Sequence, residues 1–374
     1  MEERSADLVV VGGGIVGLAH AWHAARAGLQ VVLVERDAHA VGASVRNFGH
    51  VCTTAQAGDV LALALEANQD WRALAEDAGF ALRPVGTAVL ARTAAERAVL
   101  EEFADERGRD TVRLLEPEAA ADLVGFAPPG LVGAAHLPGD LRVDGPDAIA
   151  AIAAHLQRIG VEILWRTNVL GVESGLVRTT RGAIRCAWTV VAVGHDVDRL
   201  FPDLADGHRL LRCRLRMLEI DPPGGARIAP AVLTGSSILR YDGLAQQPSA
   251  AAVRAELERD TPALLAHDVN LMLTQRPDGR VVVGDTHVRS VVEDPFEDES
   301  ADELILDEIQ RLTGARPVVR RRWRGVYASS AVGPFLVAEP ARDVTVASVT
   351  TGIGMTTALG LARRVLKNLL VPVR

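Results

Sequence analysis

Three glycines and a glutamate carry the clearest chemical signal in the sequence. Gly12, Gly14 and Gly17 follow an apolar run of β-branched residues, and Glu35 closes the next such run. In this pattern the first glycine permits a tight turn, the second lets the backbone approach a pyrophosphate, and the third lets a helix pack against a strand. The free N–H groups at the helix N-terminus attract the phosphates, and an acid about 20 residues further on binds the ribose hydroxyls. The four residues predict a dinucleotide-binding site.

The elements that must position these residues lie in the same stretch. Residues 8–11 and 31–34 are short apolar runs typical of buried strands. Residues 15–27 form an Ala-rich segment typical of a helix, which stops at Gly28. A strand, a helix and a second strand within about 30 residues predict a β-α-β unit in a parallel sheet.

A second segment helps to choose between the possible dinucleotides. Residues 42–49 read Gly-Ala-Ser-Val-Arg-Asn-Phe-Gly and begin shortly after Glu35. An enzyme that binds NAD usually continues its parallel sheet at this point. A small polar segment so close to the pyrophosphate site favours a longer cofactor, so we expect FAD. The alternative is that this segment is an ordinary polar loop.

The rest of the chain indicates two interleaved domains. Further helices are expected at 59–77, 94–107, 146–159, 249–266, 299–313 and from Gly352 to residue 370. Further strands are expected at 86–91, 131–136, 161–164, 189–193, 211–220, 238–241, 270–275, 280–284 and 344–349. From residue 211 the strands alternate basic and apolar residues, which indicates a half-exposed antiparallel sheet.

We therefore predict an α/β fold, α+β overall, in which a Rossmann-like FAD-binding domain is interleaved with a substrate-binding domain. The FAD-binding domain would comprise residues 1–82, 141–210 and 319–374. The substrate-binding domain would comprise residues 83–140 and 211–318 and would be built on a mixed, largely antiparallel sheet.

Charge and composition exclude some classes of protein. The net charge of −8 argues against a general nucleic-acid binder. The sequence has no uninterrupted apolar run of about 18 residues, so no membrane span is expected. Its acidic N-terminus is unlike a signal peptide, and its three cysteines fit no zinc or redox pair. We expect a cytoplasmic protein with reduced thiols, and the sequence does not fix its oligomeric state.

Over nearly its whole length the chain resembles the FAD-dependent oxidoreductases typified by D-amino-acid oxidase, glycine oxidase and sarcosine oxidase. The matching stretches are the first β-α-β unit, the 42–49 segment, Val191-Ala-Val-Gly194, Trp323-Arg-Gly325 and Thr351-Gly-Ile-Gly-Met-Thr356. The resemblance implies an extended FAD whose flavin faces an inserted substrate domain. It also implies that the last glycine loop faces the pyrimidine end of the flavin, where partial positive charge stabilises the anionic reduced form.

The resemblance also implies a set of cofactor contacts. Val169 would contact the adenine through its backbone, and the glycine-rich segments would supply most of the others. The expected set is Gly12, Gly14, Ile15, Val16, Gly17, Glu35, Arg36, Ser44, Arg46, Asn47, Gly49, Val169, Ala192, Gly194, Gly352, Gly354, Met355 and Thr356. We expect no metal and a non-covalent FAD. A covalent link through Cys52 or His50 is the alternative.

One position departs from the family pattern. Amino-acid oxidases of this family carry Trp-x-Gly-(Leu/Phe)-Arg, and the arginine clamps the substrate carboxylate in bidentate fashion. This sequence reads Trp323-Arg-Gly-Val-Tyr327, so a tyrosine stands at the clamp position. Either the carboxylate is held elsewhere or the substrate has none, and ordinary α-amino acids become less favoured. Basic residues that can serve instead are Arg46, Arg212, Arg214, Arg240, Arg289 and the 320–324 arginine run.

A narrower resemblance concerns the substrate. The Ser44–His50 segment, with the motifs at 323–327 and 351–356, is similar to a branch associated with bacterial phosphonate degradation, for which an aminophosphonate oxidase has been proposed. A phosphonate carries more charge and more acceptor oxygens than a carboxylate, so it favours several arginines and hydroxyls over one fork. The candidate substrate-binding residues are His50, Arg46, Tyr241, His287, Arg324, Tyr327 and Ser329.

Together the motifs predict oxidative deamination of a small amine, with an aminophosphonate as the expected substrate. A neutral amine would give up hydride from its α-carbon to the flavin, with no side-chain base required, and oxygen or another acceptor would take the electrons. One alternative is oxidation of a D-amino acid, glycine or sarcosine. A second is a hydroxy-acid dehydrogenase, which would need a base such as His287 or His50. A third is a non-catalytic flavoprotein subunit of a larger complex.

Overall fold

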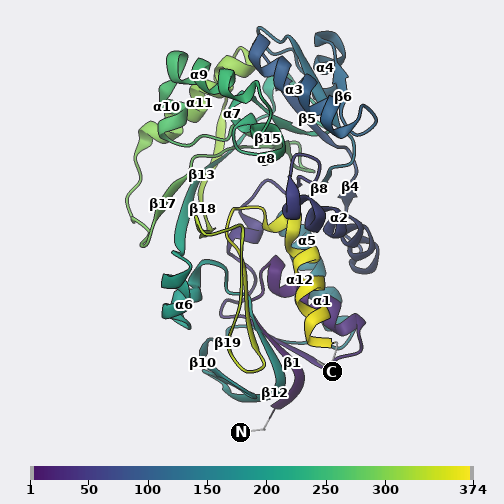
Figure 1. The fold of residues 1–374 in the computed structure, drawn as a ribbon, viewed down its shortest axis with the longest axis vertical. Helices are drawn as coiled ribbons and strands as arrows, with labels where there is room; N and C mark the ends of the chain where they lie inside the picture. Colours follow the sequence, from purple (N-terminus) through teal and green to yellow (C-terminus); the bar gives the residue numbers. More distant parts are fainter. Residues whose placement is uncertain (1–3, 371–374) are drawn as a thin grey trace.

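The computed structural model describes residues 4–370, with side chains up to residue 367. Its strands form an eight-stranded sheet, a nine-stranded sheet and a small three-stranded sheet. In Figure 1 the eight-stranded sheet lies at the lower end of the molecule and most of the nine-stranded sheet at the upper end. This combination of helices and mixed sheets confirms the predicted fold class.

The eight-stranded sheet is built around parallel strands. Its central order is β9, β2, β1, β12 and β20, and each neighbouring pair is parallel. β2 and the second half of β1 are fully buried runs of valine and leucine, as expected for strands that are covered on both faces. The bounds are β1 Arg4–Val11, β2 Val31–Val34, β9 Glu162–Leu164, β10 Val169–Glu173, β11 Leu176–Thr179, β12 Gly182–Val191, β19 Phe335–Ala341 and β20 Val344–Val349.

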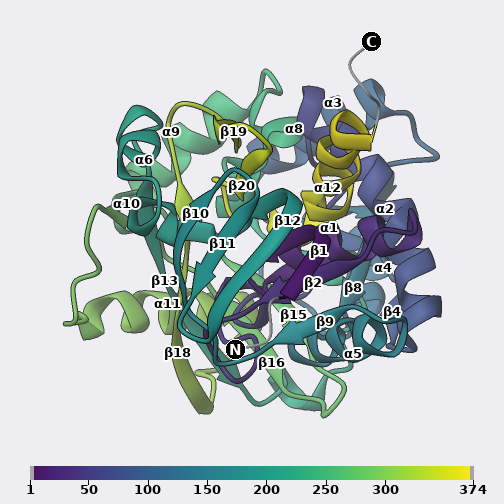
Figure 2. The ribbon, with the colours of Figure 1, turned by 90° about the horizontal axis from the view of Figure 1, so that it is seen from below.

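Four helices pack against one face of this sheet in a shared apolar core that includes Trp22 and Trp71. They are α1 Ile15–Arg26, α2 Gly58–Ala78, α5 Gly145–Arg158 and α12 Gly354–Leu370. On the other face a second core takes in the short helices η2 Gly194–Arg199 and α6 Pro202–Gly207. Figure 2 shows β10, β11, β12, β1 and β2 side by side, with α1 and α12 next to them. No described helix combines the length and the apolar character that a membrane span requires.

The nine-stranded sheet is largely antiparallel, and among its described strands only β5 and β14 pair in parallel. Its long strands β13 and β18 lie side by side and extend toward the lower sheet in Figure 1. The bounds are β5 Thr87–Ala91, β6 Arg113–Leu115, β7 Gly133–Leu137, β13 Leu211–Ile220, β14 Ala231–Leu233, β15 Met272–Gln275, β16 Val281–Gly284, β17 Val288–Ser290 and β18 Val319–Ser329.

The remaining elements belong to this upper part or join the two sheets. The helices are α3 Ala94–Arg107, α4 Pro117–Val124, α7 Gly235–Ile238, α8 Asp242–Ala245, α9 Ala250–Asp260, α10 Pro262–Ala266 and α11 Glu299–Thr313. Two short 3-10 turns are η1 Ala43–Val45 and η3 Pro223–Gly225. The small sheet consists of β3 His50–Val51, β4 Leu82–Arg83 and β8 Leu141–Val143.

Most predicted elements are present, and the exceptions have local causes. The strand predicted at 238–241 is wrong, because Thr234 and Ser237 form a reciprocal capping box that starts the short helix α7 there. The helix predicted at 249–266 is divided at Thr261, since Pro262 cannot continue a helix without losing a backbone hydrogen bond. The hairpin β10–β11 and the strand β19 were not predicted from the sequence.

The division into two domains stays a prediction, and one strand bears on its boundary. The predicted FAD-binding domain includes residues 319–329, which form β18. This strand pairs with β13 of the nine-stranded sheet along its whole length, from Leu211–Ser329 to Ile220–Val319. We propose that the boundary be placed after Ser329.

Candidate cofactor and substrate site

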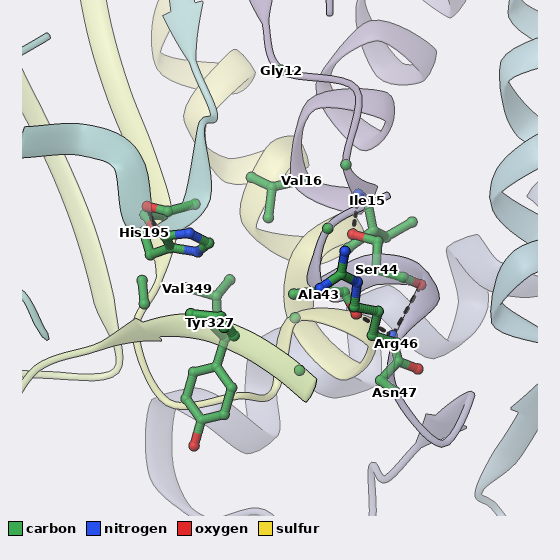
Figure 3. Close-up of a pocket in the computed structure, with 18 of the residues that line it drawn as sticks. Gly12, Ile15, Val16, Ala43, Ser44, Arg46, Asn47, His195, Tyr327 and Val349 are labelled. Atoms are coloured by element: carbon green, nitrogen blue, oxygen red, sulfur yellow. Dashed lines mark hydrogen bonds between the residues drawn. The ribbon is translucent and has the colours of Figure 1, made fainter. Parts of the chain in front are cut away.

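A large cavity, of about 700 Å³, is lined by residues of both large sheets. At one end it meets the turn between β1 and α1. At the other end it meets Tyr327 of β18 and His287, which lies between β16 and β17. Figure 3 shows Gly12, Ile15 and Ser44 on one side of this space, with His195 and Tyr327 across from them. The cavity therefore connects the two regions for which the sequence predicts chemistry.

The turn between β1 and α1 is shaped by close backbone contacts. A Cβ on Gly12 would overlap the carbonyl oxygen of Ala192, and a Cβ on Gly17 would overlap the carbonyl oxygen of Gly12. Gly12 also has a φ of 109°, which L side chains rarely adopt. Because these side chains are absent, α1 begins directly beside the ends of β1 and β12, and residues 12–16 line the cavity.

Two side chains hold the amides of this turn. Oε2 of Glu35 accepts a 2.7 Å hydrogen bond from the N–H of Gly13, and Oγ of Ser44 accepts a 2.8 Å bond from the N–H of Ile15. At Gly14, the residue that precedes α1, no side chain caps the helix. Apart from the Ile15 amide, the N–H groups of the first turn of α1 are not bonded to a side chain of the described residues, so the positive end of the helix faces the cavity, where it can bind an anion.

The segment from Gly42 to Gly49 lies against the start of α1. Asn47 fixes its shape, because its Nδ2 donates to the carbonyls of Ala43 and Ser44 at 2.9 Å each. Its Oδ1 accepts from the N–H of Gly49 at 2.7 Å. Figure 3 shows Ser44, Arg46 and Asn47 grouped beside Ile15. An internally bonded loop that contacts the helix start is a fixed part of the cavity wall and not a solvated connection.

Most residues that were predicted to bind the cofactor line the cavity. They are Gly12, Gly14, Ile15, Val16, Glu35, Arg36, Ser44, Arg46, Asn47, Val169, Ala192, Gly194, Gly352, Gly354, Met355 and Thr356. Gly17 and Gly49 do not line it but permit close packing behind its wall, where a Cβ would overlap a backbone carbonyl oxygen. The individual roles of these residues toward the cofactor stay predictions.

His195 lines the cavity and was not predicted from the sequence. Its Nε2 lies 3.9 Å from Oδ1 of Asp196 and 4.0 Å from Oε1 of Glu293. Burial lowers the pKa of its imidazole despite these carboxylates. The available signal was its position directly after Gly194, at the end of a strand that reaches the cofactor turn.

The far end of the cavity gathers polar and charged side chains from several segments. The lining residues there are Arg240, Tyr241, Asn270, Asp285, His287 and Tyr327. Burial raises the pKa of the Asp285 carboxyl and of both tyrosine hydroxyls, and it lowers the pKa of the His287 imidazole. Both phenols therefore keep their protons at neutral pH.

Most of the residues that were predicted to bind the substrate also line the cavity, and one does not. His50, Arg46, Tyr241, His287, Arg324 and Tyr327 line the cavity. Ser329 is buried opposite Leu211 and forms an isolated bridge with Thr351, so it stands outside the cavity lining. Substrate binding by any of them stays a prediction.

His50 and Cys52 bear on the covalent alternative. The His50 Nε2 lies 2.7 Å from the Thr87 hydroxyl, which donates to Oδ2 of Asp140 at 2.7 Å. Burial raises the pKa of the Cys52 thiol well above its usual value, and a protonated thiol is a poor nucleophile. This argues against a link through Cys52. His50, Cys52 and Asp140 could together face an ion, but Oδ1 of Asp140 already accepts hydrogen bonds from the Thr53 and Thr54 segment.

One cavity joins the dinucleotide turn to the polar and charged side chains at its far end, which we call the chamber. This arrangement is typical of an oxidoreductase that holds its cofactor beside its substrate. The chain belongs to the FAD dependent oxidoreductase (DAO) family, because residues 7–367 match the model of that family. FAD is therefore its cofactor, as predicted.

Curated relatives match about half of the chain. Glycine oxidase of Geobacillus kaustophilus (strain HTA426) is 27% identical over 214 residues, which are 52% of this chain and 56% of the relative. The mitochondrial pyruvate dehydrogenase phosphatase regulatory subunit of Mus musculus is 30% identical over 202 residues, which are 50% of this chain and 23% of that protein. The matches thus span little more than half of one relative and under a quarter of the other.

Solved structures match along nearly the whole chain. Glycine oxidase from Geobacillus kaustophilus has a TM-score of 0.78 at 20% identity, covering 97% of this chain and 94% of that one. L-amino acid deaminase from Proteus vulgaris, with its specific insertion deleted, has a TM-score of 0.75 at 19% identity, covering 100% and 92%. At these identities the likeness concerns the fold. The phosphonate-associated branch stays a prediction.

The described residues fit FAD. The glycine turn and the start of α1 would bind the pyrophosphate. Glu35 lines the cavity beside them. At the other end Gly352 has a φ of 74°, and a Cβ there would lie 2.8 Å from Cζ of Tyr327. This glycine keeps the loop before α12 close to Tyr327, at the far end of the cavity.

Loss of the Glu35 carboxylate is expected to weaken FAD binding. Its Oε2 and Oε1 accept the N–H groups of Gly13 and Asp37 at 2.7 and 2.9 Å, so it fixes the turn even before any ribose contact. Glu35→Ala should lower the affinity of the apoprotein for FAD by at least about tenfold, since hydrogen bonds to a charged group are lost. Quenching of flavin fluorescence on binding measures this affinity.

Glu173→Ala is the matched control, because Glu173 lies on an edge strand of the same sheet and forms an exposed ion pair with Arg178. Its FAD affinity should equal that of the wild type. An unchanged affinity of Glu35→Ala would contradict the assigned role.

Proposed function

We propose that this FAD-dependent oxidoreductase oxidises a small amine that carries an anionic group, and that the substrate is an aminophosphonate. The observation that carries the proposal is the chamber in which Arg240 and Tyr327 meet beside the loop that precedes α12. A guanidinium and a phenol hydroxyl together suit an anion with several oxygens. The names glycine oxidase and L-amino acid deaminase, which two similar proteins bear, support an amine donor.

FAD, when bound, accepts the hydride that leaves the carbon next to the amine nitrogen. The residues of the chamber would orient the substrate so that this carbon faces the flavin. Tyr241 and Tyr327 keep their protons because burial raises the pKa of both hydroxyls. Each is thus able to donate a hydrogen bond to the substrate.

In this proposal His287 would take the proton that a substrate ammonium must lose before oxidation. Its Nδ1 lies 2.7 Å from the carbonyl oxygen of Asp268, so this nitrogen carries the hydrogen and donates it. Burial lowers the pKa of the imidazole, which leaves Nε2 unprotonated at neutral pH. Nε2 lies 3.8 Å from Oδ2 of Asp285 and is able to accept a proton from the substrate ammonium, which leaves the neutral amine.

Two other functions are alternatives to amine oxidation, and each predicts a different experimental result. A hydroxy-acid dehydrogenase on this fold would also use His287, but as a base that acts on a hydroxyl. A regulatory flavoprotein subunit would bind FAD without turnover, and the partial match to the mouse regulatory subunit supports this reading. The electron acceptor and a cytoplasmic location stay predictions.

Anaerobic reduction of the flavin tests the proposed reaction. The oxidised holoenzyme is mixed with aminomethylphosphonate, 2-aminoethylphosphonate, glycine, D-alanine or glycolate, and the visible absorbance of the flavin is followed. We expect an aminophosphonate to bleach the flavin at lower concentration than glycine does, and glycolate to leave it oxidised. Bleaching by glycolate alone would favour the hydroxy-acid alternative, and no bleaching by any compound would favour the regulatory one.

His287→Ala separates deprotonation of an amine from deprotonation of an alcohol. If His287 takes a proton from a substrate ammonium, the variant should lose turnover at neutral pH and regain it at high pH, where the free amine exists in solution. An alcohol does not ionise in that range, so turnover of a hydroxy acid would stay low at every pH. Rates of flavin reduction across a pH series measure this, and a loss that is independent of pH would contradict the assigned role.

A further inference from the structure

Position 327 lacks the positive charge that the family pattern leads one to expect. Tyr327 stands where amino-acid oxidases of the family carry an arginine, and a neutral phenol cannot neutralise an anion. Given the proposed function, on which the following assignment rests, another residue must supply that charge.

Arg240 brings a guanidinium to the tip of the Tyr327 side chain. Its Nη2 donates to the Tyr327 hydroxyl at 3.3 Å and to the carbonyl oxygen of Thr351 at 2.7 Å. Thr351 directly precedes Gly352, whose backbone lies against the Tyr327 ring. The cation therefore lies beside the residue at the clamp position and beside the loop that precedes α12, although it comes from a different segment of the chain.

The segment that carries Arg240 is held firmly. Arg240 lies in the turn between α7 and α8, and its N–H donates to the carbonyl of Ser237 at 3.0 Å. Ser237 and Thr234 form the capping box of α7, and both hydroxyls also donate to the carbonyl of Leu271 on the neighbouring segment. The turn is therefore a fixed platform for the arginine, which preorganises a binding site.

Arg240 keeps free capacity for a ligand. Its two hydrogen bonds use Nη2 and involve neutral oxygens, and it forms no ion pair with any of the described residues. Nε and Nη1 are not bonded to any residue in the described part of the chain. A guanidinium has five N–H donors, so a partly buried cation with unused donors faces the cavity. No carboxylate of the described residues is in ion-pair contact with it, although the charges of Asp285 and Asp268 act on it from further away.

The other candidate arginines are already engaged by the protein. Arg214 donates to backbone carbonyls of the loop at 294–296. The remaining pairs are Arg212 with Asp196 and Asp198, Arg289 with Asp268, and Arg324 with Glu293 and Glu297. Each of these cations is neutralised or used as a structural donor before a ligand arrives.

Arg46 is the one serious competitor, because it also lines the cavity and has no ion pair with a described residue. Its Nη1 donates to the carbonyl of Arg324 at 3.1 Å, and it belongs to the Gly42–Gly49 segment that lies against the start of α1. Figure 3 shows it next to Ser44 and apart from the Tyr327 hydroxyl. This position favours the cofactor end of the cavity.

We propose that Arg240, with the Tyr327 hydroxyl as a second donor, binds the anionic group of the substrate in place of the missing clamp arginine. The ligand class is a small carboxylate or phosphonate. The sequence left two possibilities open: another residue binds the anionic group of the substrate, or the substrate has no such group. This proposal favours the first. It follows that amino acids and aminophosphonates compete for one site, and that the preference between them depends on the oxygens that Arg240 and Tyr327 contact.

Binding of anions without an amino group tests this assignment independently of turnover. Oxidised holoenzyme is titrated with methylphosphonate and with acetate, and the perturbation of flavin absorbance and the thermal shift are recorded. The wild type is expected to bind methylphosphonate more tightly than acetate. Arg240→Met should weaken methylphosphonate binding by about 100-fold, the order found when one partner of a buried charge pair is removed.

Three further variants complete the design. Arg240→Lys keeps the charge but loses the planar donor set, and it should bind the anion with intermediate affinity. Arg259→Met removes an exposed surface cation that pairs with Asp260 and should bind like the wild type. Arg46→Met should retain methylphosphonate binding once it is loaded with FAD. FAD content and circular dichroism establish that each variant is folded, and Arg240→Lys carries the test if Arg240→Met is not.

Several outcomes would overturn the assignment. One is an Arg240→Met variant that binds methylphosphonate as tightly as the wild type, or an Arg240→Lys variant that does so where Arg240→Met does not fold. Another is loss of methylphosphonate binding in Arg46→Met alone. The last is a wild type that binds neither methylphosphonate nor acetate. The proposed function fails separately. If no amine reduces the flavin but Arg240→Met loses methylphosphonate binding, the anion site stands and amine oxidation does not. If amines reduce the flavin of Arg240→Met with an unchanged KM, amine oxidation stands and the anion site does not.

Discussion

The approach of α1 to the ends of β1 and β12 is the constraint on which the rest of the site depends. Gly12 and Gly17 leave no room for a Cβ, because backbone carbonyl oxygens occupy the space that it would take. The helix start is therefore fixed beside the sheet, and its uncapped end faces the cavity. A side chain at either position would separate helix from sheet and displace the amides that Glu35 and Ser44 now hold.

A second close contact lies at the far end of the cavity. Tyr327 comes from the long strand β18 of the nine-stranded sheet, and its ring lies against Gly352 in the loop that precedes α12. Arg240 bonds both sides of this contact through Tyr327 and Thr351. One arginine thus joins the loop that precedes α12 to Tyr327 of β18, although it comes from a short turn between α7 and α8.

The sequence predicts those features that arise from local spacing. The first β-α-β unit, the acid that follows it and the Gly42–Gly49 segment all depend on residues within a short stretch, and the structure brings them together as expected. Tyr327 was recognisable as a departure because the family motif around it is also local. The FAD dependent oxidoreductase family itself follows from several such motifs in order, and the match over residues 7–367 confirms it.

Features that depend on contacts distant in sequence were harder to predict. Arg240 was one arginine among several. Only the folded chain shows that its guanidinium contacts Tyr327 and Thr351, whereas Arg212 and Arg289 form ion pairs with carboxylates. The same segment was predicted as a strand, whereas Thr234 and Ser237 form a capping box that starts a short helix there. His195 gave no signal beyond its place after Gly194, because its burial and its approach to the distant Glu293 appear only in the folded chain.

The central claim is that one cavity holds FAD at the β1–α1 turn and the anion of the substrate at Arg240. The most direct measurement is a crystal structure of the oxidised holoenzyme with methylphosphonate bound. The account predicts the pyrophosphate at the start of α1 and the phosphonate oxygens within hydrogen-bonding distance of Arg240 and the Tyr327 hydroxyl. A phosphonate bound at Arg46 or Arg324 instead, with Arg240 still bonded only to Tyr327 and Thr351, would contradict it.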